Sequence, residues 1–160
     1  MYTPGSILYF KPFVFPNGNT PKNKYFIVLK TTDSDVLIAS LPTSQDHIPH
    51  MIQKTHGCID VPEYQVNWYC YQEGQVITNT GFAFPRETFI YGHQVDHFDK
   101  SKFDLMYAVD GVDYDIIGEL LDEEYQALIN CIKNSGSVSR KIRRLLVSNI
   151  IKLVTPRSKK

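Results

Sequence analysis

The sequence predicts a mainly β fold that ends in helices, and three features of the 160-residue chain support this prediction. Six or seven short apolar runs, rich in β-branched and aromatic residues, lie between residues 7 and 91 with turn-forming residues between them, and a last one follows at 114–118. This spacing is typical of a small β-barrel or sandwich. Helical periodicity is clear only beyond residue 120, and residues 134–160 are strongly basic.

A predicted β-hairpin near the N-terminus organises the rest of the chain. Residues 7–10 form the first strand, which residues 11–15 extend past Pro12, and residues 16–23 have the composition of a loop. The runs at 25–29 and 36–41 flank a short polar turn, so they predict two buried, paired strands. Two hydroxyls, an amide, a carboxylate and an imidazole follow at 43–47, where a rigid strand end positions a variable loop.

The remaining elements follow from local patterns. Asp122 predicts the N-cap of a helix that ends before Ser135 and Gly136. Ser137 predicts the cap of a last helix from 138 to about 154. Residues 99–107 fit a short helix or a strand equally well. The other predicted strands are residues 58–61, 68–71, 75–78, 89–91 and 114–118.

Charge is distributed unevenly although the net charge is zero. Residues 1–133 hold nine basic and 17 acidic residues, a net charge of −8, whereas residues 134–160 carry +8. Four of these cations occupy the first two turns of the last predicted helix, where they oppose the helix dipole. A basic segment of this kind indicates contact with nucleic acid, with an acidic partner or with the protein's own acidic body. The four residues are Arg140, Lys141, Arg143 and Arg144.

The cysteines and the apolar runs predict a soluble, cytoplasmic protein. Three widely spaced cysteines argue against a disulfide framework and suit a reducing compartment. No apolar run is long enough for a membrane span, and no signal peptide is recognisable. His47, His50, His56 and Cys58 lie close in sequence, but their spacing matches no common zinc signature, so we expect no metal and no cofactor.

Several short motifs follow one another in an order that resembles the MazF/PemK family of toxin endoribonucleases. Their order and spacing carry the resemblance, which covers most of residues 4–134. The motifs are PGSILYF at 4–10, KYFIVL at 24–29, Thr43-Ser44-Gln45 after the next strand, HQVDHFDK at 93–100 and IGELLDEE at 117–124. The first resembles the family's opening strand, and the second its Arg-Pro followed by a strand. Thr43-Ser44-Gln45 resembles its Thr-x-Gln. The last two resemble its Gln-Val segment with a following Asp-Lys, and its closing strand with the capped helix.

The resemblance implies a fold and an activity. The fold would be an SH3-like (PemK/MazF-like) β-barrel domain with a closing helix at 1–135, followed by a basic C-terminal helical extension at 136–160. The activity would be metal-independent cleavage of single-stranded RNA, by attack of the ribose 2′-hydroxyl on the adjacent phosphorus, in a toxin–antitoxin or defence system. The implied partners are single-stranded RNA, an antitoxin protein and a second copy of the chain in a homodimer, without a membrane.

The resemblance also implies which residues form the site. Lys24 stands at the family's arginine and Thr43 at its threonine. His47 or, alternatively, His50, just beyond Thr43, would supply the base or the acid. Lys24, Thr43 and His47 are the candidate catalytic residues. The candidate RNA-binding residues are Lys22, Ser44, Gln45, Arg86, Arg140, Lys141, Arg143 and Arg144.

Two other functions stay open. Lys24 keeps the charge of the family's arginine, but a lysine cannot form two parallel hydrogen bonds to a phosphate as an arginine does. If cleavage needs those two bonds, the chain is a nuclease-inactive SH3-like module that binds RNA or a protein partner. Alternatively, the basic tail is a docking helix for an acidic protein or for a second copy of the chain, with no nucleic acid involved.

Overall fold

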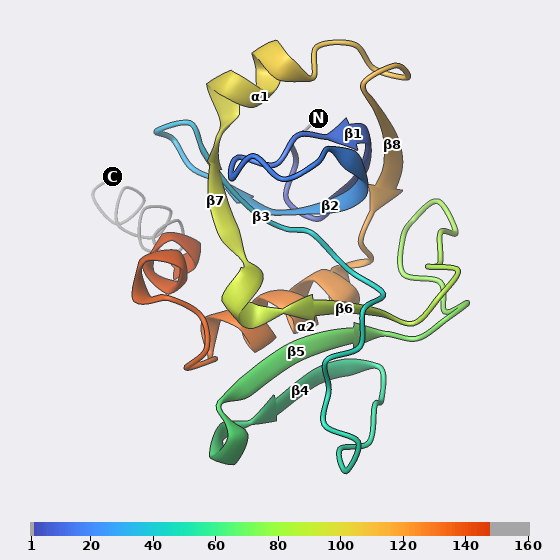
Figure 1. The fold of residues 1–160 in the computed structure, drawn as a ribbon, viewed down its shortest axis with the longest axis vertical. Helices are drawn as coiled ribbons and strands as arrows, with labels where there is room; N and C mark the ends of the chain where they lie inside the picture. The colour runs from blue at the N-terminus through green and yellow to red at the C-terminus, as the bar shows by residue number, and fades with distance from the viewer. Residues whose placement is uncertain (1, 148–160) are drawn as a thin grey trace, which may run out of the picture.

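Two antiparallel sheets with helices packed around them form the structure, a computed structural model that describes residues 2–147 (Figure 1). The larger sheet has the strand order β7-β3-β2-β1-β8, and the smaller has the order β4-β5-β6. The strands are β1 (Ser6–Phe13), β2 (Lys22–Thr31), β3 (Val36–Ser40), β4 (Gly57–Val61), β5 (Val66–Tyr71), β6 (Thr88–Tyr91), β7 (Asp96–Asp99) and β8 (Tyr114–Glu119). The helices are α1 (Lys100–Met106) and α2 (Asp122–Lys133), with 3-10 turns η1 (Pro62–Tyr64) and η2 (Gly92–Gln94). Residues 140–147 are also helical.

The predicted class, mainly β with helices toward the C-terminus, is confirmed. Within residues 2–147 the two sheets do not close into a single barrel. No helix in this part of the chain is long and apolar enough to cross a membrane.

The predicted hairpin is present as β2 and β3. Ile27 pairs with Ser40 and Thr31 with Leu37, in antiparallel register. The turn between them closes through Thr32, whose Oγ1 accepts a hydrogen bond from the Val36 amide at 3.1 Å. β1 pairs with the other edge of β2, so β2 lies at the centre of the larger sheet.

Three apolar clusters hold the layers together. The first lies between the two sheets and also contains residues of α2 and of the helix at 140–147, such as Ile142 and Leu146. The second covers the other face of the larger sheet, where the phenylalanines of β1, β2 and α1 pack edge to face. The third lies on the outer face of the smaller sheet around Trp68. Each sheet is therefore apolar on both faces.

Several predicted boundaries are wrong for local reasons. Residues 75–78 are not a strand, because only Thr78 forms a bridge, to Leu120. β7 was not predicted, although it pairs with β3. Residues 100–106 are helical because the Asp99 carboxylate caps the amides of Ser101 and Lys102.

Both C-terminal helices begin one or two residues away from the predicted cap. Leu121, rather than Asp122, is the N-cap of α2, so Asp122 lies in the first turn. The Ser139 Oγ, rather than that of Ser137, accepts a hydrogen bond from the amide of Ile142 at the start of the last helix. The predicted part of that helix beyond residue 147 lies outside the described residues.

The expectation that the cysteines form no disulfide is corrected by a bond between Cys58 and Cys131. Cys58 lies in β4 and Cys131 in α2, 73 residues apart in sequence, with their Cα atoms 5.5 Å apart. The helix packs across β4 and β5, and this packing brings the two thiols together. Cys70 remains a free, buried thiol, and burial is the main reason that its pKa rises to about 11.

Reduction of this disulfide is expected to destabilise the fold. A cross-link that closes a loop of this length restricts the unfolded chain, which typically contributes about 2–4 kcal/mol. We expect dithiothreitol to lower the urea midpoint of the wild-type protein and to leave that of the Cys58→Ser, Cys131→Ser double variant unchanged. An equal midpoint for the wild type with and without reductant would contradict this role of the bond.

Candidate functional site

Lys24 and Thr43 come together at one end of the β2–β3 hairpin. Lys24 is near the start of β2, and Thr43 follows the end of β3, so the antiparallel pairing brings both to the same end of the sheet. The Lys24 ammonium donates a hydrogen bond to the Pro42 carbonyl at 3.3 Å. The cation is therefore fixed beside the residue that precedes Thr43.

Two adjoining clefts meet at this pair. The first, which we call the loop cleft, has a volume of about 610 Å³ and is bounded by the loop after β1, with Phe15 and Asn19 in its lining. The second, the aromatic cleft, has a volume of about 490 Å³ and is lined by Tyr9, Tyr25 and Phe84 on one side. Four residues line both clefts, namely Lys22, Lys24, Thr43 and Gln45.

Thr43 is held by backbone and side-chain hydrogen bonds. Its amide donates to the Phe89 carbonyl at 3.0 Å, and the Phe89 amide donates to the Thr43 carbonyl at 2.7 Å. Its Oγ1 accepts a hydrogen bond from the Gln45 amide at 3.1 Å. Because this bond uses an oxygen lone pair, the hydroxyl proton of Thr43 remains available to donate to a ligand.

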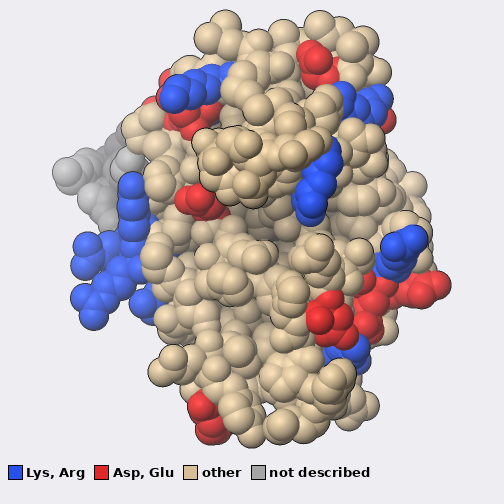
Figure 2. Space-filling view, in the orientation of Figure 1, with Lys and Arg blue, Asp and Glu red and all other residues tan. Residues whose placement is uncertain are grey.

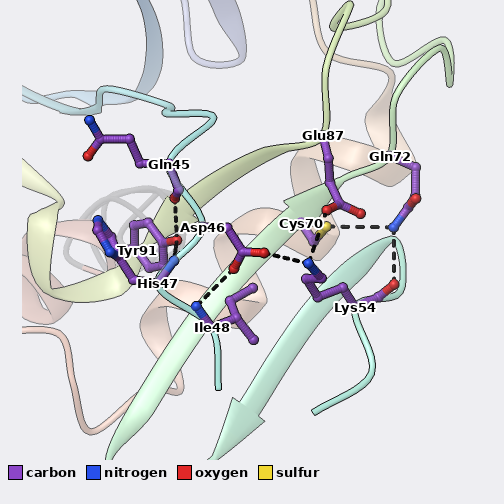
Figure 3. A network of polar contacts seen from close by, with 9 residues as sticks. All are labelled: Gln45, Asp46, His47, Ile48, Lys54, Cys70, Gln72, Glu87 and Tyr91. Atoms are coloured by element: carbon purple, nitrogen blue, oxygen red, sulfur yellow. Dashed lines mark hydrogen bonds and ion pairs between the residues drawn. The ribbon is translucent and has the colours of Figure 1, made fainter. Parts of the chain in front are cut away.

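Tyr91 fixes the loop that follows Thr43. Its hydroxyl donates to the Gln45 carbonyl at 2.6 Å and accepts from the His47 amide at 2.9 Å, as Figure 3 shows. The imidazole of His47 lies against the tyrosine ring, with the ring centroids 5.6 Å apart. One buried side chain of β6 therefore sets the path of residues 45–47.

Lys54 provides a second anchor for this loop (Figure 3). Its ammonium forms an ion pair with the Asp46 carboxylate and lies 3.6 Å from the Glu87 carboxylate. The Asp46 carboxylate also accepts from the Ile48 amide at 2.9 Å. Hydrogen bonding to Lys54 is the main reason that the pKa of Asp46 falls below its usual value. Lys54 lies in the same connection between β3 and β4 as Asp46, so this ion pair fixes the fold of the connection just before His47.

The electrostatics of the junction suit an anionic ligand. Burial, and then the charge of the neighbouring Lys22, lower the pKa of the Lys24 ammonium. Arg86 adds an exposed cation to the lining of the aromatic cleft. Cations and hydroxyl donors around one point match the needs of a phosphate group.

The structure brings together seven of the residues that the sequence singled out. Lys22, Lys24, Thr43 and Gln45 line both clefts, His47 lines the loop cleft, and Ser44 and Arg86 line the aromatic cleft. His50, the alternative to His47, lines neither cleft.

The four predicted basic residues of the last helix lie elsewhere. Figure 2 shows Lys and Arg side chains gathered beside the helix at 140–147, at the left of this face. The Lys141 ammonium lies 3.4 Å from the His97 imidazole of β7. Among the described residues, the loop cleft and the aromatic cleft are lined by none of these four, Arg140, Lys141, Arg143 and Arg144.

Sequence reasoning missed the aromatic side chains around the site. Tyr9 and Tyr25 pair across β1 and β2, with their ring centroids 4.7 Å apart, and both remain half-buried in the aromatic cleft. The sequence does place Tyr25 next to Lys24 at the start of a predicted strand, and Tyr9 in the preceding predicted strand, so both could have been predicted to lie near Lys24. Tyr91 was missed because a strand tyrosine usually indicates a core position.

Metal ligation is not supported by the histidines near the site. His56 bonds to the Glu124 carboxylate at 2.7 Å and accepts from the Gln72 amide, and Cys58 is in the disulfide. Within residues 2–147, no three His, Cys, Asp or Glu side chains converge to hold a metal ion.

Removal of the Tyr91 hydroxyl is expected to release the loop. In Tyr91→Phe the His47 amide loses its acceptor and the Gln45 carbonyl loses its donor, both at part-buried positions, which lowers the free energy of unfolding by about 1 kcal/mol. We expect faster hydrogen exchange at the His47 amide, measured by NMR. Tyr64→Phe, which removes an exposed hydroxyl outside the loop, is the matched control. Unchanged protection of the His47 amide in Tyr91→Phe would show that Tyr91 does not hold the loop.

Comparison with known proteins finds no family model that matches the sequence and no curated protein that matches it. The function of the chain therefore has to be inferred from the residues around Lys24 and Thr43.

Proposed function

We propose that this chain is a divergent MazF/PemK-like endoribonuclease that cleaves single-stranded RNA without a metal, in a toxin–antitoxin or defence system. The observation that carries the proposal is the position of Lys24 and Thr43, which both line the junction of the loop cleft and the aromatic cleft. These are the two residues at the family's arginine and threonine. The proposal includes an open variant of the SH3-like fold, in which two antiparallel sheets share one apolar core without closing into a barrel.

The proposed reaction is an internal transfer at phosphorus. The ribose O2′ forms a bond to the adjacent phosphorus while the bond from phosphorus to O5′ breaks, which leaves a 2′,3′-cyclic phosphate and a 5′-hydroxyl. The 2′-hydroxyl proton passes to a base, and an acid gives a proton to the leaving O5′. Negative charge that develops on the phosphorane oxygens needs a cation and hydrogen-bond donors.

The residues at the junction match these needs. The Lys24 ammonium is the cation for the phosphorane, and the available Thr43 hydroxyl proton is the donor. His47, whose backbone is fixed by Tyr91, is the candidate base or acid at the edge of the loop cleft.

RNA binding in this proposal uses both polar and aromatic groups. Lys22 and Arg86 contact the phosphates on either side of the scissile one, and Ser44 and Gln45 hydrogen-bond to the ribose and base edges. Tyr9 and Tyr25 offer half-buried rings to a base. The cations at 140–144 add phosphate contacts further along the strand. A homodimer and an antitoxin protein complete the proposal.

A nuclease-inactive SH3-like module is the second candidate. The observation in its favour is the Lys24 ammonium, which donates to the Pro42 carbonyl. Unlike the guanidinium of an arginine, it cannot form two parallel hydrogen bonds to one phosphate. This candidate predicts salt-sensitive binding of RNA, or of a protein partner, without cleavage.

Substitutions at the junction test the two candidates. If the chain is a nuclease, Lys24→Met and Thr43→Ala each lower kcat/KM on a single-stranded RNA, in EDTA, by about 10²–10³, the usual effect of losing one charge-stabilising group. Thr43→Ser keeps the hydroxyl and most of the activity. His47→Ala lowers kcat by about 10²–10⁴ if the imidazole transfers a proton.

Lys102→Met is the control, because Lys102 is an exposed lysine of α1 outside both clefts. Cleavage that survives in all three site variants would place the reaction elsewhere. RNA binding without cleavage by the wild type would favour the inactive module.

The pH dependence of cleavage provides a further check. The protonated form of Lys24 is the active one, so the rate falls as pH rises through the Lys24 pKa. Burial and Lys22 lower this pKa, so the fall occurs at a lower pH than for an ordinary lysine. Lys22→Gln removes the second cause and is expected to move the fall to higher pH, whereas Lys102→Gln leaves it in place. A basic limb that does not respond to Lys22→Gln would exclude Lys24 as its origin.

A further inference from the structure

One end of the molecule carries an exposed apolar surface outside both clefts. α1 and the turn that follows it lie at the top of Figure 1, at one end of the long axis. Four large apolar side chains are exposed there within eight residues, namely Leu105 (84%), Met106 (46%), Val109 (51%) and Val112 (65%). We call these four residues the α1 surface. Exposed apolar side chains that gather in this way usually mark a site of contact with another molecule.

The sequence of α1 explains why its apolar side chains point in two directions. Phe103 and Tyr107, four residues apart, face the core and are only 5% and 4% exposed. Leu105 and Met106 stand at positions i+3 and i+4 from Lys102, so these three residues are neighbours on the helix surface. Lys102, Leu105 and Met106 therefore share one flank of α1, which faces away from the core.

Hydrogen bonds fix the turn that carries the other half of the α1 surface. The Val109 carbonyl accepts from the amides of Val112 at 3.2 Å and Asp113 at 2.9 Å, and the Asp113 carboxylate accepts from the Val109 amide at 2.9 Å. The Lys11 amide of β1 donates to the Asp113 carbonyl at 2.9 Å, so the turn is also bonded to the larger sheet. A surface that is already ordered loses little conformational entropy when a partner binds.

One cation and one anion lie at the two ends of the α1 surface. Lys102 lies in the first turn of α1, and Asp110 directly follows Val109. Both charged side chains are exposed, and neither has an ion-pair partner among residues 2–147. Their neighbours Lys100 and Asp104, in contrast, pair with each other at 3.1 Å. The surface therefore offers one positive and one negative group to a partner.

The order of cation, apolar centre and anion is self-complementary under a two-fold rotation. Met106 is midway in sequence between Lys102 and Asp110. If two copies of α1 cross antiparallel at Met106, Lys102 of each copy faces Asp110 of the other. The apolar side chains of the two copies then cover each other between the two ion pairs. A parallel crossing would place like charges together, which is unfavourable.

We propose that the α1 surface binds the α1 surface of a second copy of the chain, which gives a two-fold symmetric dimer. The proposal gives the homodimer of the proposed function an interface, but it depends on this surface and not on RNA cleavage. Four apolar side chains and two ion pairs form a small interface, so the dimer is reversible rather than permanent.

Sedimentation velocity over a range of protein concentrations tests the dimer. The wild type is expected to shift from monomer to dimer as its concentration rises. Leu105→Asp buries two carboxylates at the apolar centre and is expected to weaken the dimer by about tenfold or more. Met51→Asp is the matched control, because Met51 is 75% exposed and lies outside the α1 surface. A wild type that stays monomeric up to about 1 mM, or an equally tight dimer of Leu105→Asp, overturns the proposal.

Exchange of the two charges tests the antiparallel geometry. Lys102→Glu and Asp110→Lys each place like charges opposite each other at both ends of the interface, so each alone is expected to weaken the dimer by about threefold to tenfold. An equimolar mixture of the two variants is expected to form a heterodimer of wild-type affinity, because opposite charges again meet at both ends. Circular dichroism checks that each variant is folded. A mixture of folded variants that associates no better than either variant alone would rule out the proposed pairing.

Failure of the dimer and failure of the nuclease are separable. Lys24→Met is expected to dimerise as the wild type does, because Lys24 lies outside the α1 surface. Both clefts are lined by one chain, so Lys102→Met, which weakens the dimer, remains a control for cleavage. Dimerisation without RNA cleavage would retain this interface and reject the nuclease. Cleavage by a chain that stays monomeric would do the reverse.

Discussion

Strand β2 is paired on both edges and covered on both faces, and this constraint shapes the rest of the molecule. β1 and β3 use the hydrogen-bonding groups of its two edges. Phe26 and Val28 point into one apolar cluster, and Ile27 and Leu29 point into another. A strand buried in this way has room for polar side chains only at its ends. Lys22 and Lys24 occupy one of those ends, which explains why the polar clefts lie there.

The site is assembled from both sheets rather than from one. Lys24 belongs to the larger sheet, whereas the loop that carries Thr43 and His47 is bonded to Phe89 and Tyr91 of the smaller sheet. Burial of the Tyr91 side chain makes its two hydrogen bonds effective, because a buried polar group without a partner is strongly unfavourable. The larger sheet therefore supplies the cation, and the smaller sheet supplies the position of the loop.

Local patterns predicted the elements with strong periodicity and failed where distant contacts decide. The hairpin was predictable because apolar β-branched runs flank a polar turn. β7 was not, because Phe98 is its only apolar residue and its pairing with β3 determines its conformation. The bond between Cys58 and Cys131 depends on how α2 crosses the smaller sheet, which sequence spacing does not contain. The cluster around Lys24 and Thr43 was predictable from strand ends and motif order, whereas the role of Tyr91 depends on backbone atoms 44 and 46 residues away.

The bridge between Thr43 and Phe89 joins the segment that follows β3 of the larger sheet to β6 of the smaller sheet. Its two backbone hydrogen bonds join the two sheets, and we call this junction the seam. Lys24 lies on the side of the larger sheet, and the loop anchored by Tyr91 lies on the side of the smaller sheet. Any sliding of the sheets along this seam alters the separation of the two halves of the site. A small molecule bound in the seam would therefore change the distance between Lys24 and the loop without touching Lys24 or the Thr43 hydroxyl.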